Sequence, residues 1–97
     1  STATSPANEF GELVVYPNPV RPEYQGNIAV KGMMNNSEVK IINASGIHIR
    51  TIFSNGGQAI WDGFDKNNQL VGSGVYYFLA TSDDGYSKSK TKILIIR

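Results

Sequence analysis

Seven short segments rich in β-branched and aromatic residues follow one another along the chain, each bounded by residues that favour turns. They span residues 12–16, 27–31, 38–43, 47–53, 58–61, 75–82 and 86–96. Several alternate apolar and polar side chains, which is typical of a strand with one buried and one solvated face. No segment places apolar residues at helical spacing over three turns. The sequence therefore predicts a single all-β domain, a seven-stranded antiparallel β-sandwich.

The same alternation predicts which side chains share a face. In segment 47–53, Ile47, Ile49 and Phe53 are expected on the buried face, with His48 and Arg50 on the solvated one. Segment 75–82 is apolar on both faces, which predicts a central position in its sheet.

The stretch from residue 61 to residue 77 contains the only tryptophan in the chain. Trp61 and Tyr77 are large side chains, and their burial is expected to centre the small core. The residues between them that favour turns are Asp62, Gly63, Asp65, Asn67, Asn68, Gly72 and Gly74. Asp62, Asp65 and Asn67 also offer oxygen ligands at loop spacing. The stretch lacks the EF-hand pattern and its closing glutamate, so turn formation is favoured over calcium binding.

The composition argues against several classes of function. The chain has no cysteine and one histidine, so it predicts no zinc site, and His48 is interpreted as a solvated strand residue. A formal net charge of +1 argues against general nucleic-acid binding. An enzyme is the least expected class because catalytic groups are few, and no cofactor or metal is predicted. No apolar run approaches the ~20 residues of a membrane-spanning helix.

The first residues differ in composition from the rest. Residues 1–9 are small, polar or proline, apart from one acid, which is typical of a linker. We expect residues 1–10 to join an upstream passenger to a folded domain at residues 11–97.

The last segment changes character halfway along. Lys88, Lys90 and Lys92 alternate with small polar residues, whereas Ile93, Leu94, Ile95 and Ile96 form a continuous apolar run before Arg97. The favoured interpretation of the lysines is protection of an edge strand against pairing with other chains. The alternative is a contact surface for an anionic partner.

Five different short motifs follow one another along residues 11–97. They are Tyr16-Pro17-Asn18-Pro19, residues 39–46, Trp61-Asp62-Gly63-Phe64-Asp65, residues 70–77 with Ser73-Gly74-Val75-Tyr76, and residues 92–96. In these motifs and their order the chain resembles the C-terminal sorting domains of the type IX secretion system. It departs from the family pattern at Asn68-Gln69, where many members have Asp/Asn-Gly, so the geometry of that turn is left open.

The resemblance implies an immunoglobulin-like sandwich at the C-terminus of a protein exported by Bacteroidetes-type bacteria. In that family the domain is not catalytic. It is recognised by the outer-membrane machinery once the passenger is in the periplasm, and the protein ends at the outer membrane, at the cell surface or outside the cell. A sortase-type surface peptidase usually removes the domain, here within or near residues 1–10, and joins the passenger to anionic lipopolysaccharide. Some members keep the domain, among them a β-propeller component of the machinery.

Recognition by strand addition is one mode open to such a domain, with residues 92–97 as the expected edge. An exposed last strand could also pair two copies into a dimer. Deletion of residues 93–97 is expected to abolish export, with unfolding of the domain as the competing explanation.

Two non-secretory functions remain as alternatives. One is a module that binds glycan or lipopolysaccharide through exposed aromatics, with Tyr16, Tyr24, Tyr76 and Tyr86 as candidates. The other is a structural immunoglobulin-like domain, similar to that of the flagellar hook-capping protein.

Overall fold

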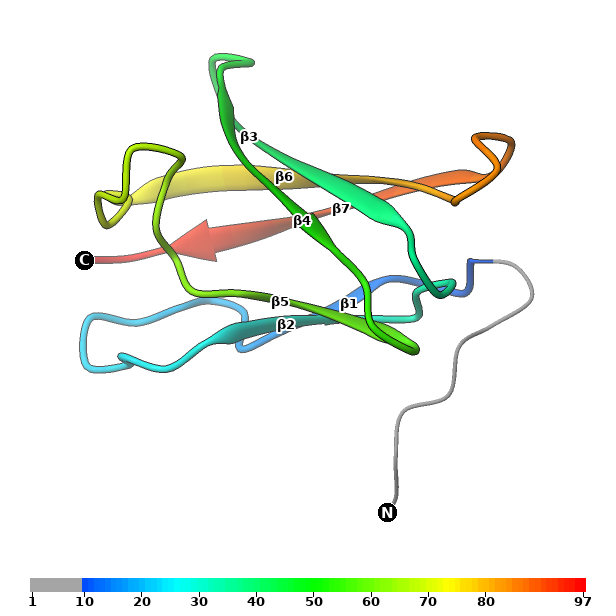
Figure 1. The fold of residues 1–97 in the computed structure, drawn as a ribbon. Helices are drawn as coiled ribbons and strands as arrows, with labels where there is room; N and C mark the ends of the chain where they lie inside the picture. The colour runs from blue at the N-terminus through cyan, green and yellow to red at the C-terminus, as the bar shows by residue number, and fades with distance from the viewer. Residues whose placement is uncertain (1–9) are drawn as a thin grey trace.

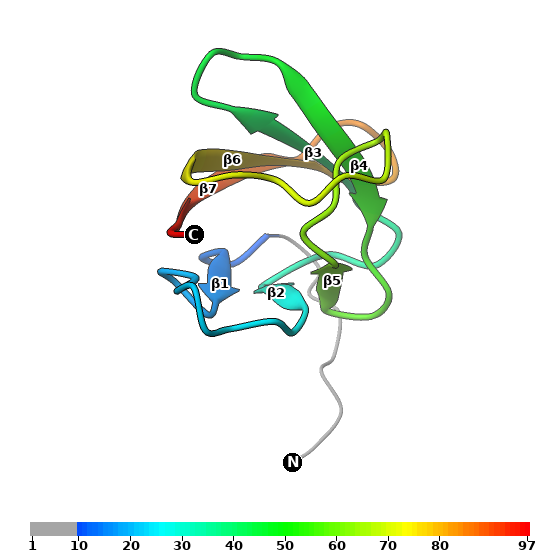
Figure 2. The ribbon, with the colours of Figure 1, turned by 90° about the vertical axis from the view of Figure 1, so that its left-hand side faces the viewer.

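The computed structural model describes residues 10–97, which form two antiparallel sheets packed face to face (Figures 1 and 2). The strands are β1 (Val14–Tyr16), β2 (Ile28–Lys31), β3 (Glu38–Asn43), β4 (His48–Phe53), β5 (Gln58–Trp61), β6 (Gly74–Thr81) and β7 (Lys88–Ile95). One sheet has the order β1-β2-β5 and the other the order β4-β3-β6-β7. The predicted seven-stranded antiparallel β-sandwich is confirmed. The linker expected at residues 1–10 lies outside the described residues except for Phe10.

The strands differ from the predicted segments by at most two residues at any end. β3 and β5 begin and end where predicted. β7 starts at Lys88 instead of residue 86 because the preceding turn is longer, with Ser82 N–H donating to Ser87 O (2.9 Å). β6 lies between β3 and β7, which confirms its central position. No helix within residues 10–97 is long and apolar enough to cross a membrane.

The buried face of β4 is not the one predicted. Ile47 and Phe53 are 58% and 63% exposed, and only Ile49 of the predicted set packs against the core. Ile52 is buried instead, because it pairs with Val39, whose side chain points inward. The register of the β3–β4 ladder shifts partway along, so alternation counted from one end of β4 assigns the wrong face.

Trp61 lies at the centre of the core and is fully buried. Its ring centroid lies 5.9 Å from that of Tyr76 and 5.7 Å from that of Phe78, the latter pair edge to face at 84°. The prediction that Tyr77 is buried in the core together with Trp61 is wrong by one residue. β6 is aromatic on both faces, and it is Tyr76 that points inward and is buried, while Tyr77 is only half-buried.

The connection after β1 closes the outer edge of β7 and thereby joins the two sheets. Val20 N–H donates to Leu94 O (2.8 Å), and Ile96 N–H donates to Val20 O (2.7 Å). The Asn18 side chain adds two bonds, from Nδ2 to Lys92 O (3.3 Å) and from Leu94 N–H to Oδ1 (3.2 Å). The apolar half of β7 therefore has its outward backbone groups bonded within the chain.

A buried pair of serines holds the β2–β3 connection against the end of β4. Ser54 Oγ accepts from Ser37 N–H (2.8 Å) and donates to Met34 O (2.5 Å). Both serines are buried. In a Ser54→Ala variant the buried Ser37 N–H loses its acceptor, and we expect a loss of about 1–3 kcal/mol in unfolding free energy. Urea denaturation measures this; the exposed Ser45→Ala serves as the control, and equal midpoints would contradict the assignment.

Candidate recognition surface

Two connections, β1–β2 and β5–β6, meet the residues that follow β7 at the end of the sandwich where β1, β5 and β7 finish (Figure 1). We call this the motif end and define it by Val20, Gly63, Leu70, Ser73 and Arg97. Val71 N–H donates to Gly63 O (3.0 Å), and Arg97 N–H donates to Ser73 Oγ (2.8 Å). Gly63 belongs to one of the five sequence motifs, and Leu70 and Ser73 belong to another. Val20 directly follows a third motif and Arg97 directly follows a fourth, so segments distant in sequence meet at one place.

The Trp-x-Gly-x-Asp motif builds the turn that leads from β5 into this end. Trp61 Nε1–H donates to Phe64 O (2.9 Å), which fixes the indole from outside the core. Gly63 has φ of 84°, a left-handed conformation that favours glycine. Asp65 Oδ1 accepts from Asn67 N–H (2.8 Å) and Gln69 N–H (2.9 Å). Asp65 therefore acts as a turn former, as the sequence predicted.

Residues 16–19 place the connection that crosses to β7. Tyr16 is exposed on the outside of the three-stranded sheet, opposite Ala29 of β2. Pro17 and Pro19 are half-buried, and the peptide bonds before them are both cis. Asn18 is the residue of this motif that contacts β7.

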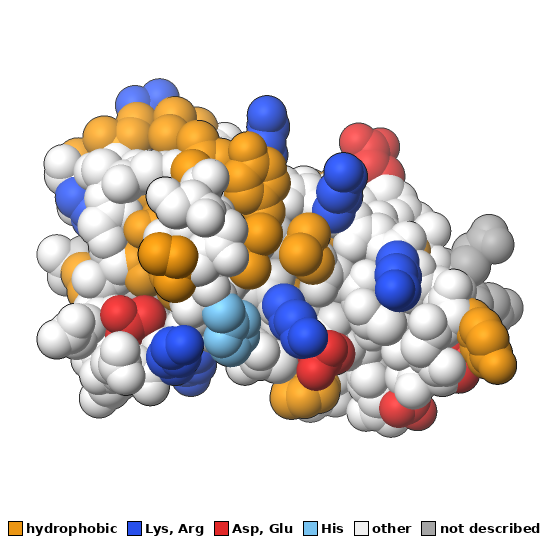
Figure 3. Space-filling model, turned by 90° about the horizontal axis from the view of Figure 1, so that it is seen from above, with side chains coloured by type: hydrophobic (Ala, Val, Ile, Leu, Met, Phe, Trp, Pro, Cys, Tyr) orange, Lys and Arg blue, Asp and Glu red, His pale blue; other side chains and the backbone are white. Residues whose placement is uncertain are grey.

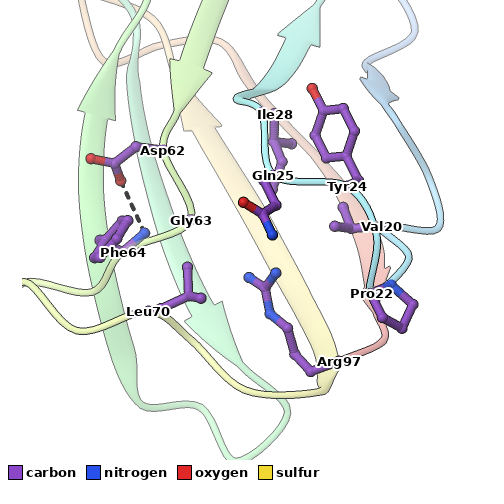
Figure 4. Close-up of a pocket in the computed structure, with 11 residues that line it drawn as sticks. Val20, Pro22, Tyr24, Gln25, Ile28, Asp62, Gly63, Phe64, Leu70 and Arg97 are labelled. Carbon is purple, nitrogen blue, oxygen red and sulfur yellow. Dashed lines mark hydrogen bonds between the residues drawn. The ribbon is translucent and has the colours of Figure 1, made fainter.

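The residues predicted for recognition on β7 have different surroundings. Ile93 and Ile95 are buried in the core and cannot contact a partner in the folded domain, while Leu94 is partly exposed. Strand addition along residues 92–96 is disfavoured because the bonds from Asn18 and Val20 already occupy that edge. Arg97 lies beyond the strand, with its side chain at the motif end (Figure 4).

The predicted lysines are exposed on the outer face of the four-stranded sheet. Figure 3 shows Lys and Arg side chains on this side of the molecule, some of them beside hydrophobic ones. The pairing register adds a fourth lysine that the sequence analysis did not include: Lys40 of β3 and Lys90 of β7 flank Leu79 of β6. The signal was available, because Lys40 alternates with inward residues. A shallow depression of about 470 Å³ lies here, bordered also by Lys88.

A pocket of about 390 Å³ opens at the motif end (Figure 4). It is lined by Val20, Pro22, Tyr24, Gln25, Gly26, Ile28, Asp62, Gly63, Phe64, Leu70 and Arg97. The Arg97 guanidinium is held at its edge, because Nε donates to Val71 O (3.0 Å). The sequence does not reveal this pocket, because its walls come from the β1–β2 connection, the β5–β6 connection and the last residue of the chain, which are distant in sequence.

An ion pair supports one wall of the pocket. Arg50 Nη1 donates to Asp62 Oδ1 (3.0 Å) and to Phe64 O (3.2 Å), and Phe64 N–H donates to the same carboxylate oxygen (2.9 Å). Both charged side chains are partly exposed, so the pair adds little to stability. Its effect is to orient the Asp62 turn and to balance the Asp62 charge locally.

The tyrosines proposed for glycan binding do not form one surface. Tyr76 is buried and packs on Trp61, so its assignment as an exposed contact is wrong. Tyr24 is half-buried and donates to Asn27 O (2.6 Å). Tyr16 is on β1, and Tyr86 lies in the β6–β7 turn. The predicted solvated position of His48 is confirmed: it is exposed, with Nε2 2.8 Å from Thr51 Oγ1.

Burial raises the pKa of Tyr76 above its ordinary value of 10.0, and nearby Arg97 partly offsets this. The neutral phenol, which donates to Gly72 O (2.9 Å), is therefore the form that the fold favours. This stabilisation is complete below pH 10 and is lost as pH rises through the folded-state pKa. We expect the stability advantage of the native chain over Tyr76→Phe to shrink above pH 10. Urea titrations at several pH values test this, and an advantage that grows with pH would contradict it.

Within residues 10–97 no group of three or more His, Cys, Asp or Glu side chains could hold a metal ion. The preference for turn formation over calcium binding at Asp62, Asp65 and Asn67 agrees with the backbone bonds that Asp62 and Asp65 accept.

No protein-family model matches the chain, and no curated protein matches it. Among solved structures, the chain is similar to PorZ of Porphyromonas gingivalis, described as an essential bacterial surface component of the type IX secretion system. The TM-score is 0.78 at 27% sequence identity, and the match covers 89% of this chain and 12% of PorZ. The chain is thus similar, over almost its full length, to one small part of a type IX secretion component.

Proposed function

We propose that this chain is a non-catalytic sorting domain that the type IX secretion machinery recognises to carry a passenger across the outer membrane to the cell surface. The observation that carries the proposal is that two motifs and the residues directly after two others meet at one end of the fold, in a chain similar to part of PorZ. The long separations between these residues mean that the surface exists only in the folded domain. A partner that reads this end would therefore read folding as well as sequence.

The finer steps follow from the same proposal. A sortase-type surface peptidase would cut within or near residues 1–10 and release the passenger for attachment to anionic lipopolysaccharide. Retention of the domain, as part of a surface component, is the alternative fate. Mass spectrometry of the mature surface protein distinguishes them, because the peptide containing Trp61 is present only if the domain is retained.

The test is delivery of an inert cargo. Residues 1–97 fused behind a periplasmically exported fluorescent protein are expected to bring that protein outside a host with a working type IX system. The same fusion in a host lacking the system should leave the cargo in the periplasm. Cargo that stays in the periplasm of the competent host, with the domain folded by protease resistance, would overturn the proposal.

A second candidate function rests on the lysine-bearing outer face of the four-stranded sheet. Lys40, Lys88, Lys90 and Lys92 form a cationic surface with apolar residues between them, which suits an anionic amphiphile such as lipopolysaccharide. Replacement of Lys88, Lys90 and Lys92 by glutamine should then weaken lipopolysaccharide binding in a sedimentation assay. If lipopolysaccharide binding and export are both unchanged, the remaining interpretation is that these lysines protect the sheet edge against pairing with other chains.

A further inference from the structure

We propose that the pocket at the motif end binds a carboxylate accompanied by an apolar side chain on a segment of a partner protein, with Arg97 as the anion-binding residue. That the partner belongs to the secretion machinery rests on the proposed function. The binding of a carboxylate rests on the pocket alone.

The pocket has the size and lining of a ligand site. Its volume of about 390 Å³ lies within the range of small-ligand pockets. Its walls are mostly apolar, formed by Val20, Pro22, Ile28, Phe64 and Leu70. Such walls favour an occupant with an apolar body that fills the space and a polar group at one side only.

Arg97 supplies that polar side in a fixed orientation. Its main-chain N–H is bonded to Ser73 Oγ (2.8 Å) and its Nε to Val71 O (3.0 Å), so the two terminal nitrogens remain directed into the pocket, where the Gln25 amide faces them (Figure 4). Within residues 10–97 no Asp or Glu side chain lies within 4.0 Å of this guanidinium. A held guanidinium without an internal anion is ready to bind an external one.

The charge of the pocket favours a carboxylate over a phosphate. Asp62 is the only acid in the lining, and its charge is balanced by Arg50. Among the lining side chains, the Arg97 guanidinium therefore carries one positive charge that no other side chain balances, which matches a monoanion. A planar carboxylate also fits the two terminal nitrogens of a guanidinium in a bidentate pair. A phosphate ester brings nearly two negative charges and a third oxygen, for which the described lining offers no second free cation.

The occupant is a protein segment because an acidic residue beside an apolar one supplies both features in a short peptide. The pocket is open at the surface, so a loop or an extended segment can enter it without the domain changing shape. Arg97 is itself exposed, so the affinity of a single short peptide is expected to be millimolar.

The experiment is a titration of the ¹⁵N-labelled 97-residue chain, followed by NMR. The probes are acetyl-Phe-Glu-amide, the neutral acetyl-Phe-Gln-amide, and inorganic phosphate. The glutamate peptide is expected to shift the backbone amides of Gly26, Gly63 and Leu70 in a saturable way. The glutamine peptide should bind at least about tenfold more weakly, because it loses the charged bidentate bond. Equal binding of the two peptides would overturn the proposal, and so would tighter binding of phosphate.

Variants assign the effect to Arg97. Arg97→Gln should weaken binding of the glutamate peptide at least about tenfold. Arg97→Lys should keep part of the affinity, because the positive charge remains although the two parallel N–H donors of the guanidinium are lost. Lys90→Gln removes the same charge from a remote sheet face and should leave binding unchanged. Leu70 and Arg97 are neighbours at Gly63: a Cβ added to this glycine would lie 3.6 Å from Leu70 Cδ1 and 3.7 Å from Arg97 Nη2. Leu70→Glu therefore places a carboxylate beside Arg97 and should block peptide binding from within the domain. Unchanged binding in Arg97→Gln, with a native amide spectrum, would sink the assignment.

The titration tests the carboxylate site and the delivery assay tests the sorting function, so the two proposals can be contradicted independently. Carboxylate binding without delivery of fused cargo would keep the site and remove only the secretory partner. Delivery without any carboxylate binding would remove this site and leave the sorting function to another surface.

Discussion

A Trp61→Ala variant is expected to lose about 3–5 kcal/mol of unfolding free energy, the largest effect of any single substitution in this chain. The indole is fully buried, packs against Tyr76 and Phe78, and donates its N–H to Phe64 O. Truncation leaves a cavity between two sheets that cannot collapse onto it, and removes one of the two donors to the Phe64 carbonyl, leaving the bond from Arg50 Nη1. Domains of this size are stable by about 5–15 kcal/mol, so the variant would be marginal at physiological temperature.

Circular dichroism measures this loss, because the variant has no tryptophan fluorescence to follow. A loss of this size lowers the melting temperature by roughly 4–8 °C per kcal/mol. Tyr86→Ala is the matched aromatic control: Tyr86 is 89% exposed in a turn, and its removal should change stability by less than about 0.5 kcal/mol. Similar melting temperatures for the two variants would contradict the placement of Trp61 in the core.

The second large effect is expected on β7, where Ile95→Ala should cost about 2–5 kcal/mol and Leu94→Ala less than about 1 kcal/mol. The two residues are neighbours on one strand but point to opposite sides. Ile95 is fully buried between the sheets, whereas Leu94 is 43% exposed. Urea denaturation of both variants gives the comparison, and equal losses would show that β7 does not pack as described.

This result also decides how a truncation should be interpreted. Deletion of residues 93–97 removes the buried Ile93 and Ile95 together with the backbone groups that bond to Val20. We expect that deletion to unfold the domain. Loss of export after it would therefore report folding and not recognition, so point variants at the surface are needed.

The fold could be predicted from the sequence because its signals are local. β3 and β5 each carry a clear alternation bounded by turn residues, and both were placed to the residue. The buried face of β4 could not be predicted, because the register shift against β3 decides that Ile52 faces inward. The choice between Tyr76 and Tyr77 was equally open, since β6 presents aromatic side chains on both faces and only its neighbours decide which face is buried.

The candidate site could be predicted only in part, because it is built by contacts between distant residues. The motifs pointed to the right segments, but not to their meeting. Asn18 and Lys92 are 74 residues apart in sequence, and their bond is what occupies the edge that the sequence analysis had offered for strand addition. The sequence indicates Arg97 only as the residue after an apolar strand; its role at the pocket depends on bonds to Val71 and Ser73, to which nothing in the sequence connects it.

The most direct test of the central claim compares two folded variants of the cargo fusion. Leu70→Glu changes an exposed apolar residue at the motif end, and Tyr86→Glu changes one in the β6–β7 turn. We measure fluorescent cargo outside the cells after both domains are shown to melt like the native one. Reduced delivery with Leu70→Glu and native delivery with Tyr86→Glu is the predicted result. Native delivery with both, or an equal loss with both, would contradict recognition of this domain through its motif end.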